Sequence, residues 1–224
     1  MERSEVAIVI PAYNEEKTVG NVVASILSYG DVIVVDDCSI DGTARVSRKA
    51  GAIVVSHGKN QGYDGALNSG FDKALEIGKK YIITFDADGQ HDPKLVETYL
   101  KNLENDYELV LGVRPKKARV SEKLIGHYFR FRFGIRDILC GMKGYRIELL
   151  KLNGKFDHVG SIGSELSFFS IKMGARFKQV PVPIYERKDS PRFGNLLKSN
   201  LRIIRALLKI ILLDLSFNKR VHRF

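Results

Sequence analysis

Two carboxylates one residue apart follow an apolar run. Residues 81–85 are β-prone, and Asp86 and Asp88 come directly after them. A buried strand ending here would hold both acids in one short turn. Carboxylate oxygens are hard ligands for Mg²⁺ or Mn²⁺, and a bound diphosphate can complete the coordination of such an ion. The spacing predicts a metal site with Gln90 and His91 as candidate third ligands, although an isolated Asp-x-Asp is more often an exposed acidic turn.

The composition narrows the class of protein. At 224 residues and 44% hydrophobic, the chain is long enough for one α/β domain with a full core. Cys38 and Cys140 show neither disulfide-framework nor zinc-site spacing, which favours a reducing compartment. The amino terminus is charged and runs straight into a strand, so no signal peptide is expected. These features together predict a cytoplasmic protein.

The net charge of +10 is concentrated in two segments. Residues 114–136 carry eight Lys/Arg against one acid, and residues 192–224 carry eight against one acid. The rest of the chain is slightly acidic. Regional basicity of this kind indicates two surfaces that face anions, such as phosphate, lipid or RNA.

Short apolar strands alternate with helices along the first half of the chain. Strands are expected over residues 6–10, 31–35, 52–56, 81–85 and 108–113, with helices over 15–27, 43–50, 66–77 and 94–104 between them. This alternation predicts an α/β fold with a mostly parallel sheet flanked by helices. Open sheets of this type bind ligands outside the carboxyl ends of their strands.

Polar residues follow several of these strand ends. Tyr13 and Glu15 follow the first strand, and either they hold a nucleoside or Tyr13 packs and Glu15 serves the helix dipole. Asn14 is expected to cap the helix that follows. Asp36 or Asp37, after the second strand, is a candidate for binding a base or ribose. The first loop lacks Gly-x-Gly-x-x-Gly, so NAD and FAD are not expected.

Four motifs in order carry a family resemblance: Pro-Ala-Tyr-Asn-Glu-Glu at 11–16, Val-Asp-Asp-x-Ser-x-Asp-Gly-Thr at 35–43, Asn-x-Gly at 60–62 and Asp-Ala-Asp-Gly-Gln-His at 86–91. They resemble the motifs of family 2 glycosyltransferases. The segments at 136–146, 163–166 and 180–183 are similar to those of dolichyl-phosphate mannose and glucose synthases. The resemblance implies a GT-A, Rossmann-like fold over residues 1–193, a nucleotide-diphosphate sugar donor, Mg²⁺ or Mn²⁺, and inversion at the anomeric carbon.

The resemblance also assigns roles to individual residues. The nucleotide-binding residues it implies are Pro11, Tyr13, Glu15, Asp37, Ala87 and Arg114. The metal ligands it implies are Asp86, Asp88 and Gln90. Independently of the family, a chelated cation and a nearby Arg114 suit the chemistry, because the leaving diphosphate gains charge as the sugar bond breaks. Asp88 and Arg114 are therefore counted as catalytic.

The acceptor is open on sequence grounds. Glu165, at the start of an expected helix over residues 165–173, is counted as a catalytic candidate, and Asp137 is a second acid in this half. Glu165 is a general base if the acceptor is a hydroxyl, orients groups if the acceptor is a phosphate, or only begins the helix. A polar loop with Arg187, Lys188, Ser190 and Arg192 either closes over phosphates or stays solvated.

Residues 194–224 are expected to form a basic amphipathic helix and tail. Over 195–217, Lys198, Arg202, Arg205 and Lys209 fall on one stripe with Leu and Ile on the remaining faces. The segment is too charged for a membrane span, which needs about 20 apolar residues. It either lies in a membrane interface, cations toward the headgroups, or packs on the domain with the stripe in water.

A second interfacial patch is expected over residues 121–136, where Phe and Arg are interleaved. The preferred hypothesis is a membrane-surface enzyme, peripheral on the cytoplasmic face, that moves a hexose from GDP-mannose or UDP-glucose to a polyprenyl or dolichyl phosphate. A second hypothesis is transfer to a saccharide or other hydroxyl acceptor with Glu165 as base. A third is a non-catalytic nucleotide- or RNA-binding protein. Nucleic acid is not the expected partner, because no RNA-module signature is present.

Overall fold

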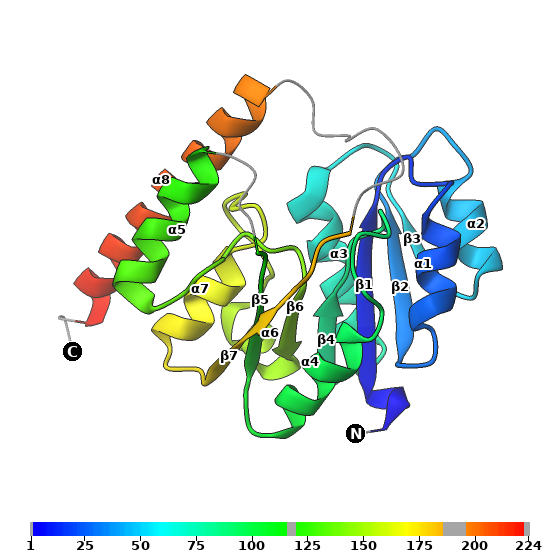
Figure 1. Cartoon of the computed structure of the whole chain (residues 1–224), viewed down its shortest axis with the longest axis horizontal. Coiled ribbons are helices and arrows are strands. Elements are labelled where there is room, and N and C mark those ends of the chain that lie inside the picture. Colours follow the sequence, from blue (N-terminus) through cyan, green and yellow to red (C-terminus); the bar gives the residue numbers. More distant parts are fainter. Residues whose placement is uncertain (1, 116–119, 186–195, 222–224) are drawn as a thin grey trace.

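A mixed β-sheet forms the centre of the structure. The computed structural model describes residues 2–115, 120–185 and 196–221, and there the sheet has seven strands in the order β3-β2-β1-β4-β6-β5-β7 (Figure 1). The strands are β1 (Val6–Ala12), β2 (Asp31–Asp36), β3 (Ile53–Ser56), β4 (Tyr81–Thr84), β5 (Leu109–Val113), β6 (Lys143–Arg146) and β7 (Phe177–Pro181). Only the pairings of β6 with β4 and β5 are antiparallel. The predicted mixed, mostly parallel sheet is confirmed.

Helices cover both faces of this sheet (Figure 1). They are a 3₁₀ turn η1 (Arg3–Glu5), then α1 (Val19–Ile26), α2 (Thr43–Lys49), α3 (Gly62–Glu76), α4 (Leu95–Glu104), α5 (Val120–Phe133), α6 (Ile147–Asn153), α7 (Glu165–Lys172) and α8 (Leu196–Val221). Helices α1 and α4 pack on one face with α2 beside them, and α3, α6 and α7 pack on the other. Within the described residues, no helix combines the length and hydrophobicity needed to cross a bilayer.

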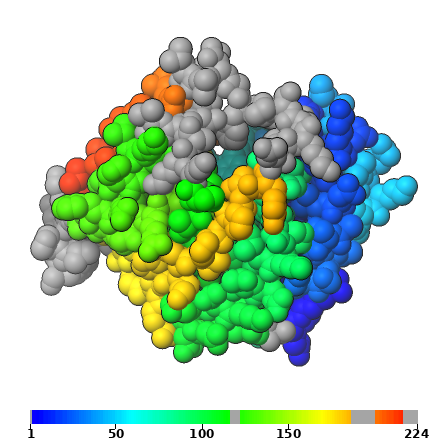
Figure 2. Space-filling view, in the orientation of Figure 1, coloured from blue at the N-terminus to red at the C-terminus, as the bar shows by residue number. Residues whose placement is uncertain are grey.

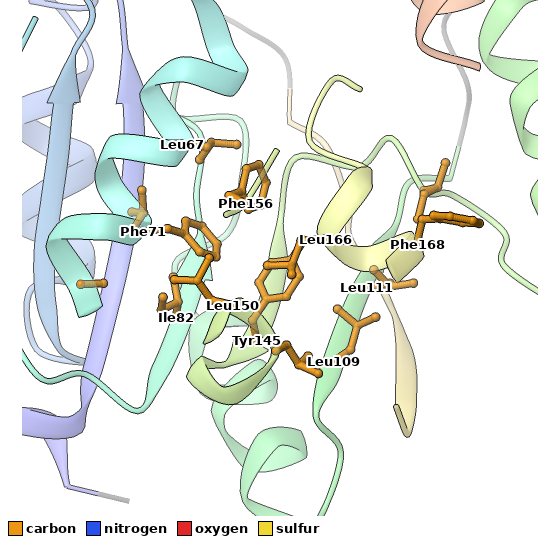
Figure 3. Packing of buried hydrophobic residues seen from close by; sticks show 14 of the residues in the cluster. Leu67, Phe71, Ile82, Leu109, Leu111, Tyr145, Leu150, Phe156, Leu166 and Phe168 are labelled. Atoms are coloured by element: carbon orange, nitrogen blue, oxygen red, sulfur yellow. The ribbon is translucent and has the colours of Figure 1, made fainter. Parts of the chain in front are cut away.

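The strands are apolar on both sides because both sides are covered. Along β1, Ala7 and Val9 belong to the hydrophobic cluster beneath α3, while Ile8 and Ile10 belong to the cluster beneath α1. Strand residues alternate between faces, so a doubly covered strand reads as a continuous apolar run. Figure 3 shows the first cluster, in which the ring of Phe71 on α3 lies 5.5 Å from that of Tyr145 on β6.

The register of the parallel strands brings the predicted site residues to one edge. Ala12 of β1 lies opposite Asp36 of β2, and Val9 lies opposite Thr84 of β4. The loops that leave β1, β2 and β4 therefore emerge at the same carboxyl edge, where open α/β sheets bind ligands.

One predicted helix cap is wrong. Asn14 does not cap α1, which begins at Val19. Its side-chain Oδ1 accepts a hydrogen bond from the backbone N–H of Ile40, and its own N–H donates to Ser39 Oγ. Asn14 has φ of 55°, a left-handed conformation that Asn tolerates better than most residues. Its role is to join the loop after β1 to the loop after β2.

The helix predicted over residues 195–217 is present as α8, and it packs on the domain. Ile203 and Ile210 are buried in the cluster that contains Phe71. The division at residue 193 stays a prediction, since α8 shares this core with the rest of the chain. Arg187, Lys188, Ser190 and Arg192 lie outside the described residues, as does the side chain of Lys198.

Candidate active site

The turn after β4 places the two predicted metal-binding carboxylates. Asp88 Oδ1 accepts a hydrogen bond from the N–H of Gln90 at 3.0 Å, which closes the turn. Gly89 has φ of 74°, a conformation that glycine adopts without strain. The amide nitrogen of Gln90 donates to the carbonyl of Tyr185, so the opposite atom of that amide, its oxygen, is the one left to act as a ligand.

His91 supports Asp86 from the protein side. Its Nε2 donates to Asp86 Oδ2 at 2.9 Å, and the imidazole is almost fully buried. Burial disfavours the charged imidazolium, but the hydrogen bond and the negative charge of Asp86 outweigh it and raise the pKa of His91. His91 thus positions Asp86 through Nε2, while its buried Nδ1 has no hydrogen-bond partner among the described residues.

The surroundings of Asp86 fit a hard cation. A Cβ atom on Gly141 would lie 2.5 Å from Asp86 Oδ2, so any side chain there would fill the space beside the carboxylate. Across the described ranges, no three His, Cys, Asp or Glu side chains gather into a metal-binding group. The predicted ligands Asp86, Asp88 and Gln90 would supply two carboxylates and an amide oxygen, a set that leaves positions for phosphate and water, as Mg²⁺ prefers.

Arg114 is held in place at the end of β5. Its Nε and Nη2 donate to the two carboxylate oxygens of Asp137 at 2.7 and 3.0 Å, and Glu122 lies 3.4 Å from the same Nη2. Burial would lower the pKa of Arg114, but the bond and charge of Asp137 raise it, so the guanidinium stays charged. Both carboxylate oxygens of Asp137, the second acid considered for the acceptor side, accept hydrogen bonds from Arg114.

A pocket of cationic side chains opens beside Arg114. It has a volume of about 340 Å³ and lies between the end of β5 and α5. Its lining residues are Val113, Arg114, Pro115, Lys123, Gly126, His127, Arg130 and Arg136. The lining contains no acid, so the pocket suits an anionic group such as a phosphate.

Asp37, predicted to hold the nucleoside, is held by hydrogen bonds from the segment at residues 57–62, which leads into α3. Oδ1 accepts from the N–H of Gln61 and from Nδ1 of His57, and Oδ2 accepts from the N–H of Gly62, all at 2.7 Å. The other ring nitrogen of His57 hydrogen-bonds to Ser69 Oγ at 2.8 Å. Sequence reasoning missed His57, whose separation from Asp37 in the chain gives no pattern.

The remaining nucleoside candidates lie around the end of β1. Pro11 belongs to this strand, and Tyr13 is 43% exposed just beyond it. Glu15 is buried, and its Oε2 accepts from Thr18 Oγ1 at 3.0 Å. Ala87 is buried in the cluster beneath α1 and α4, so its methyl group faces the core. Of these, Tyr13 offers the most accessible surface for stacking.

Glu165 lies at the start of α7, where its carboxylate is engaged by backbone and side chain. Its Oε2 accepts from the N–H groups of His158 and Val159 at 2.7 and 3.2 Å, and Oε1 accepts from His158 Nδ1 at 2.7 Å. These contacts stabilise the loop over residues 157–165.

Other buried groups that the sequence did not single out hold the same loop. Asp64 of α3 accepts from the N–H of Gly163 at 2.6 Å, and burial followed by the charge of Asp157 raises the pKa of Asp64. Lys143 of β6 donates to the carbonyl of Gly163. Burial lowers the pKa of Lys143 to about 8. The loop is therefore fastened to the sheet and to α3.

Comparison with known proteins identifies the family. The model of glycosyl transferase family 2 matches residues 7–159. The chain therefore belongs to glycosyl transferase family 2.

Individual relatives agree with this assignment. An uncharacterized protein of Methanocaldococcus jannaschii is 33% identical over 88% of this chain and 88% of its own. The undecaprenyl-phosphate mannosyltransferase of Micrococcus luteus is 30% identical over 82% of this chain and 84% of its own. The crystal structure of glucosyl-3-phosphoglycerate synthase from Mycobacterium tuberculosis with Mn²⁺, UDP-glucose and phosphoglyceric acid is 20% identical, with a TM-score of 0.72 over 92% of this chain and 79% of that one. That last likeness confirms the GT-A type of fold.

Proposed function

We propose that this protein transfers a hexose from a nucleotide-diphosphate sugar to a polyprenyl phosphate. The observation that carries the proposal is the cationic pocket, whose charged lining residues are Arg114, Lys123, Arg130 and Arg136 and which opens beside the carboxyl edge of the sheet. A neutral saccharide acceptor has no use for positive charge beyond what the donor diphosphate needs, whereas a phosphate monoester does. The undecaprenyl-phosphate mannosyltransferase among the relatives supports the same acceptor class.

The donor half rests on the edge formed by the loops after β1, β2 and β4. Tyr13 and the backbone above Asp37 would hold the nucleoside, and Asp86, Asp88 and Gln90 would hold Mg²⁺ or Mn²⁺ against the diphosphate. When bound, such an ion neutralises the charge that develops on the leaving diphosphate. The Mn²⁺ and UDP-glucose in the similar mycobacterial structure support this arrangement.

The reaction exchanges one carbon–oxygen bond for another. An oxygen of the polyprenyl phosphate forms a bond to the anomeric carbon, and the bond from that carbon to the donor diphosphate breaks with its electron pair. The nucleoside diphosphate leaves, and attack from the opposite side inverts the anomeric centre. Because the phosphate acceptor is already an anion, no residue has to remove a proton. Arg114, fixed by Asp137, is placed to stabilise the phosphate charges.

The acceptor assay decides between this proposal and transfer to a hydroxyl. Purified protein is incubated with GDP-mannose or UDP-glucose, Mn²⁺ and either a polyprenyl phosphate or the matching polyprenol, and the lipid extract is analysed by mass spectrometry. A polyprenyl-phosphate hexose formed only from the phosphate supports the proposal. Product from the polyprenol or from an added saccharide would assign a hydroxyl acceptor, and nucleotide binding without turnover would assign a binding protein.

A further inference from the structure

Helix α8 has a fixed orientation on the domain. Its carboxylate Asp214 is buried and accepts hydrogen bonds from Tyr128 Oη at 2.9 Å and from Lys172 Nζ at 2.7 Å. These contacts join α8 to α5 and α7. Figures 1 and 2 show α5 and α8 side by side at the end of the molecule opposite α2. Which side of α8 faces outward is therefore settled by its contacts.

The outward side of this helix pair is apolar. Five exposed residues of α8 fall on one stripe, because their spacings of three and four residues follow the helix repeat. They are Leu201, Ile204, Leu208, Leu212 and Leu215, with exposed fractions from 39% to 65%. On α5, Leu124 is 56% exposed and Phe131, seven residues later, is 97% exposed. We call these seven residues the apolar ridge. Exposed aliphatic side chains in such number mark a contact surface.

Positive charge accompanies the ridge on both helices. Arg202, Arg205 and Lys209 are exposed on α8, and Lys123 and Arg130 are exposed on α5. In residues 122–133 and 200–215, the only acids are Glu122 and Asp214, and both are buried. The outward face in these two segments thus combines apolar side chains with cations and has no exposed acid.

The contacts of α8 bear on which of its residues could meet a membrane. The sequence predicts a stripe of Lys198, Arg202, Arg205 and Lys209 that either faces the headgroups or stays in water while the helix packs on the domain. In the structure, Lys209 Nζ donates to the carbonyl of Val159, and the charge of Arg202 acts on the half-buried Asp64. This edge of α8 lies over the loop at residues 157–165, and the ridge is the part of the helix left to meet a partner.

We propose that the apolar ridge is a docking face for an anionic lipid surface. Its leucines, Ile204 and Phe131 would enter the acyl boundary, and the exposed cations Arg205, Lys123 and Arg130 would meet the headgroups. A second copy of this chain is a poorer partner, since two such faces would bring cations against cations. Lys123 and Arg130 also line the cationic pocket, so docking would place that pocket at headgroup depth. This last step rests on the proposed function, whereas docking itself does not.

Vesicle co-sedimentation of the full chain tests the proposal without donor or acceptor. Vesicles of phosphatidylcholine with phosphatidylglycerol are compared with phosphatidylcholine alone at low and high salt. The wild type is expected to bind the anionic vesicles. The double variant Leu208→Gln/Leu212→Gln is expected to bind them at least about tenfold more weakly. The matched control is Leu152→Gln, because Leu152 on α6 is 64% exposed and Leu212 is 65% exposed. The control should bind like the wild type.

Two results would overturn the proposal. The wild type could fail to bind anionic vesicles, or the double variant could bind them as tightly as the wild type. A dimer of the wild type that the double variant abolishes, seen by light scattering, would assign the ridge to a second copy. Activity on a short-chain, water-soluble polyprenyl phosphate should be unchanged in the double variant. If no transfer occurs in any variant but vesicle binding follows the ridge, the proposed function fails while the docking face stands.

Discussion

The guanidinium of Arg114 and the carboxylate of Asp137 form a two-point ion pair, with Nε and Nη2 at 2.7 and 3.0 Å from the two oxygens. Asp137 is 3% exposed at its side chain, whereas Arg114 is 20% exposed and borders the cationic pocket. The pair therefore fixes the orientation of the Arg114 guanidinium, which still borders the cationic pocket.

Replacing Asp137 by Asn is expected to lower kcat about 10- to 100-fold, because one arm of Arg114 loses its acceptor and its orientation. Steady-state kinetics with polyprenyl phosphate measure this effect. Glu122→Gln is the comparison, since Glu122 contacts the same guanidinium at the longer distance of 3.4 Å and should matter less. A folded Asp137→Asn enzyme with wild-type turnover would contradict this role.

The strands that end at the carboxyl edge, β1, β2 and β4, could be predicted from the sequence, whereas β6 could not. The apolar runs that become β1, β2 and β4 are long enough to be recognised, and the acids after them mark their ends. Strand β6 is only Lys143–Arg146, and its buried lysine and glycine hide the pattern of an inner strand. It is inserted antiparallel between β4 and β5, a pairing set by tertiary contacts alone.

Two further features could not be predicted because they depend on distant contacts. Asp64 binds the N–H of Gly163, and Asp214 binds Lys172, across separations that leave no periodic signal. The pattern of α8 has apolar residues around most of its circumference, so periodicity could not say which of them face the core. Asp214 decides this, because burying its carboxylate requires hydrogen-bond partners, and α5 and α7 supply them.

His57 is expected to act as a positioning residue for nucleotide binding. Its ring links Asp37 to Ser69, and Asp37 in turn orders the N–H groups of Gln61 and Gly62. His57→Phe should weaken nucleoside diphosphate binding about tenfold through loss of this support. Isothermal titration with GDP and UDP measures it, and His57→Gln, which keeps a donor, should recover part of the affinity. Equal affinities in all three proteins would remove His57 from the site.

The variant Glu165→Gln distinguishes a positioning role of Glu165 from a role as general base. The carboxylate accepts from two backbone N–H groups and one imidazole, so an amide would turn a donor toward donors and loosen the loop at residues 157–165. We expect the KM for polyprenyl phosphate to rise about tenfold, with the shape of the pH profile of kcat kept. Loss of the rising limb of that profile would instead identify Glu165 as a base.

Lys143 predicts a particular dependence of stability on pH. Burial lowers its pKa from 10.5 to about 8 in the folded protein, so between these values the unfolded chain binds more protons. The contribution of Lys143 to the free energy of unfolding should therefore rise with pH across this window, by about 1.4 kcal/mol per pH unit.

Urea unfolding at several pH values from 7.5 to about 10 tests this expectation when the wild type is compared with Lys143→Met. The difference in stability should grow in favour of the wild type as pH rises. Lys49→Met, at an exposed position on α2, should run parallel to the wild type. If the stability of Lys143→Met instead ran parallel to that of the wild type across this pH range, burial would not lower the pKa of Lys143 in the folded protein.

Transfer of hexose to polyprenyl phosphate by wild type, Asp88→Asn and Asp92→Asn, each with Mn²⁺ and with a chelator, tests the central claim most directly. Asp92 is the matched control, because it lies four residues away and its Oδ1 accepts the N–H of Lys94 instead of facing the turn. We predict lipid-linked hexose from the wild type and Asp92→Asn only when Mn²⁺ is present, and at least about 100-fold less from Asp88→Asn. Undiminished transfer by Asp88→Asn, or by the wild type in the chelator, would contradict it.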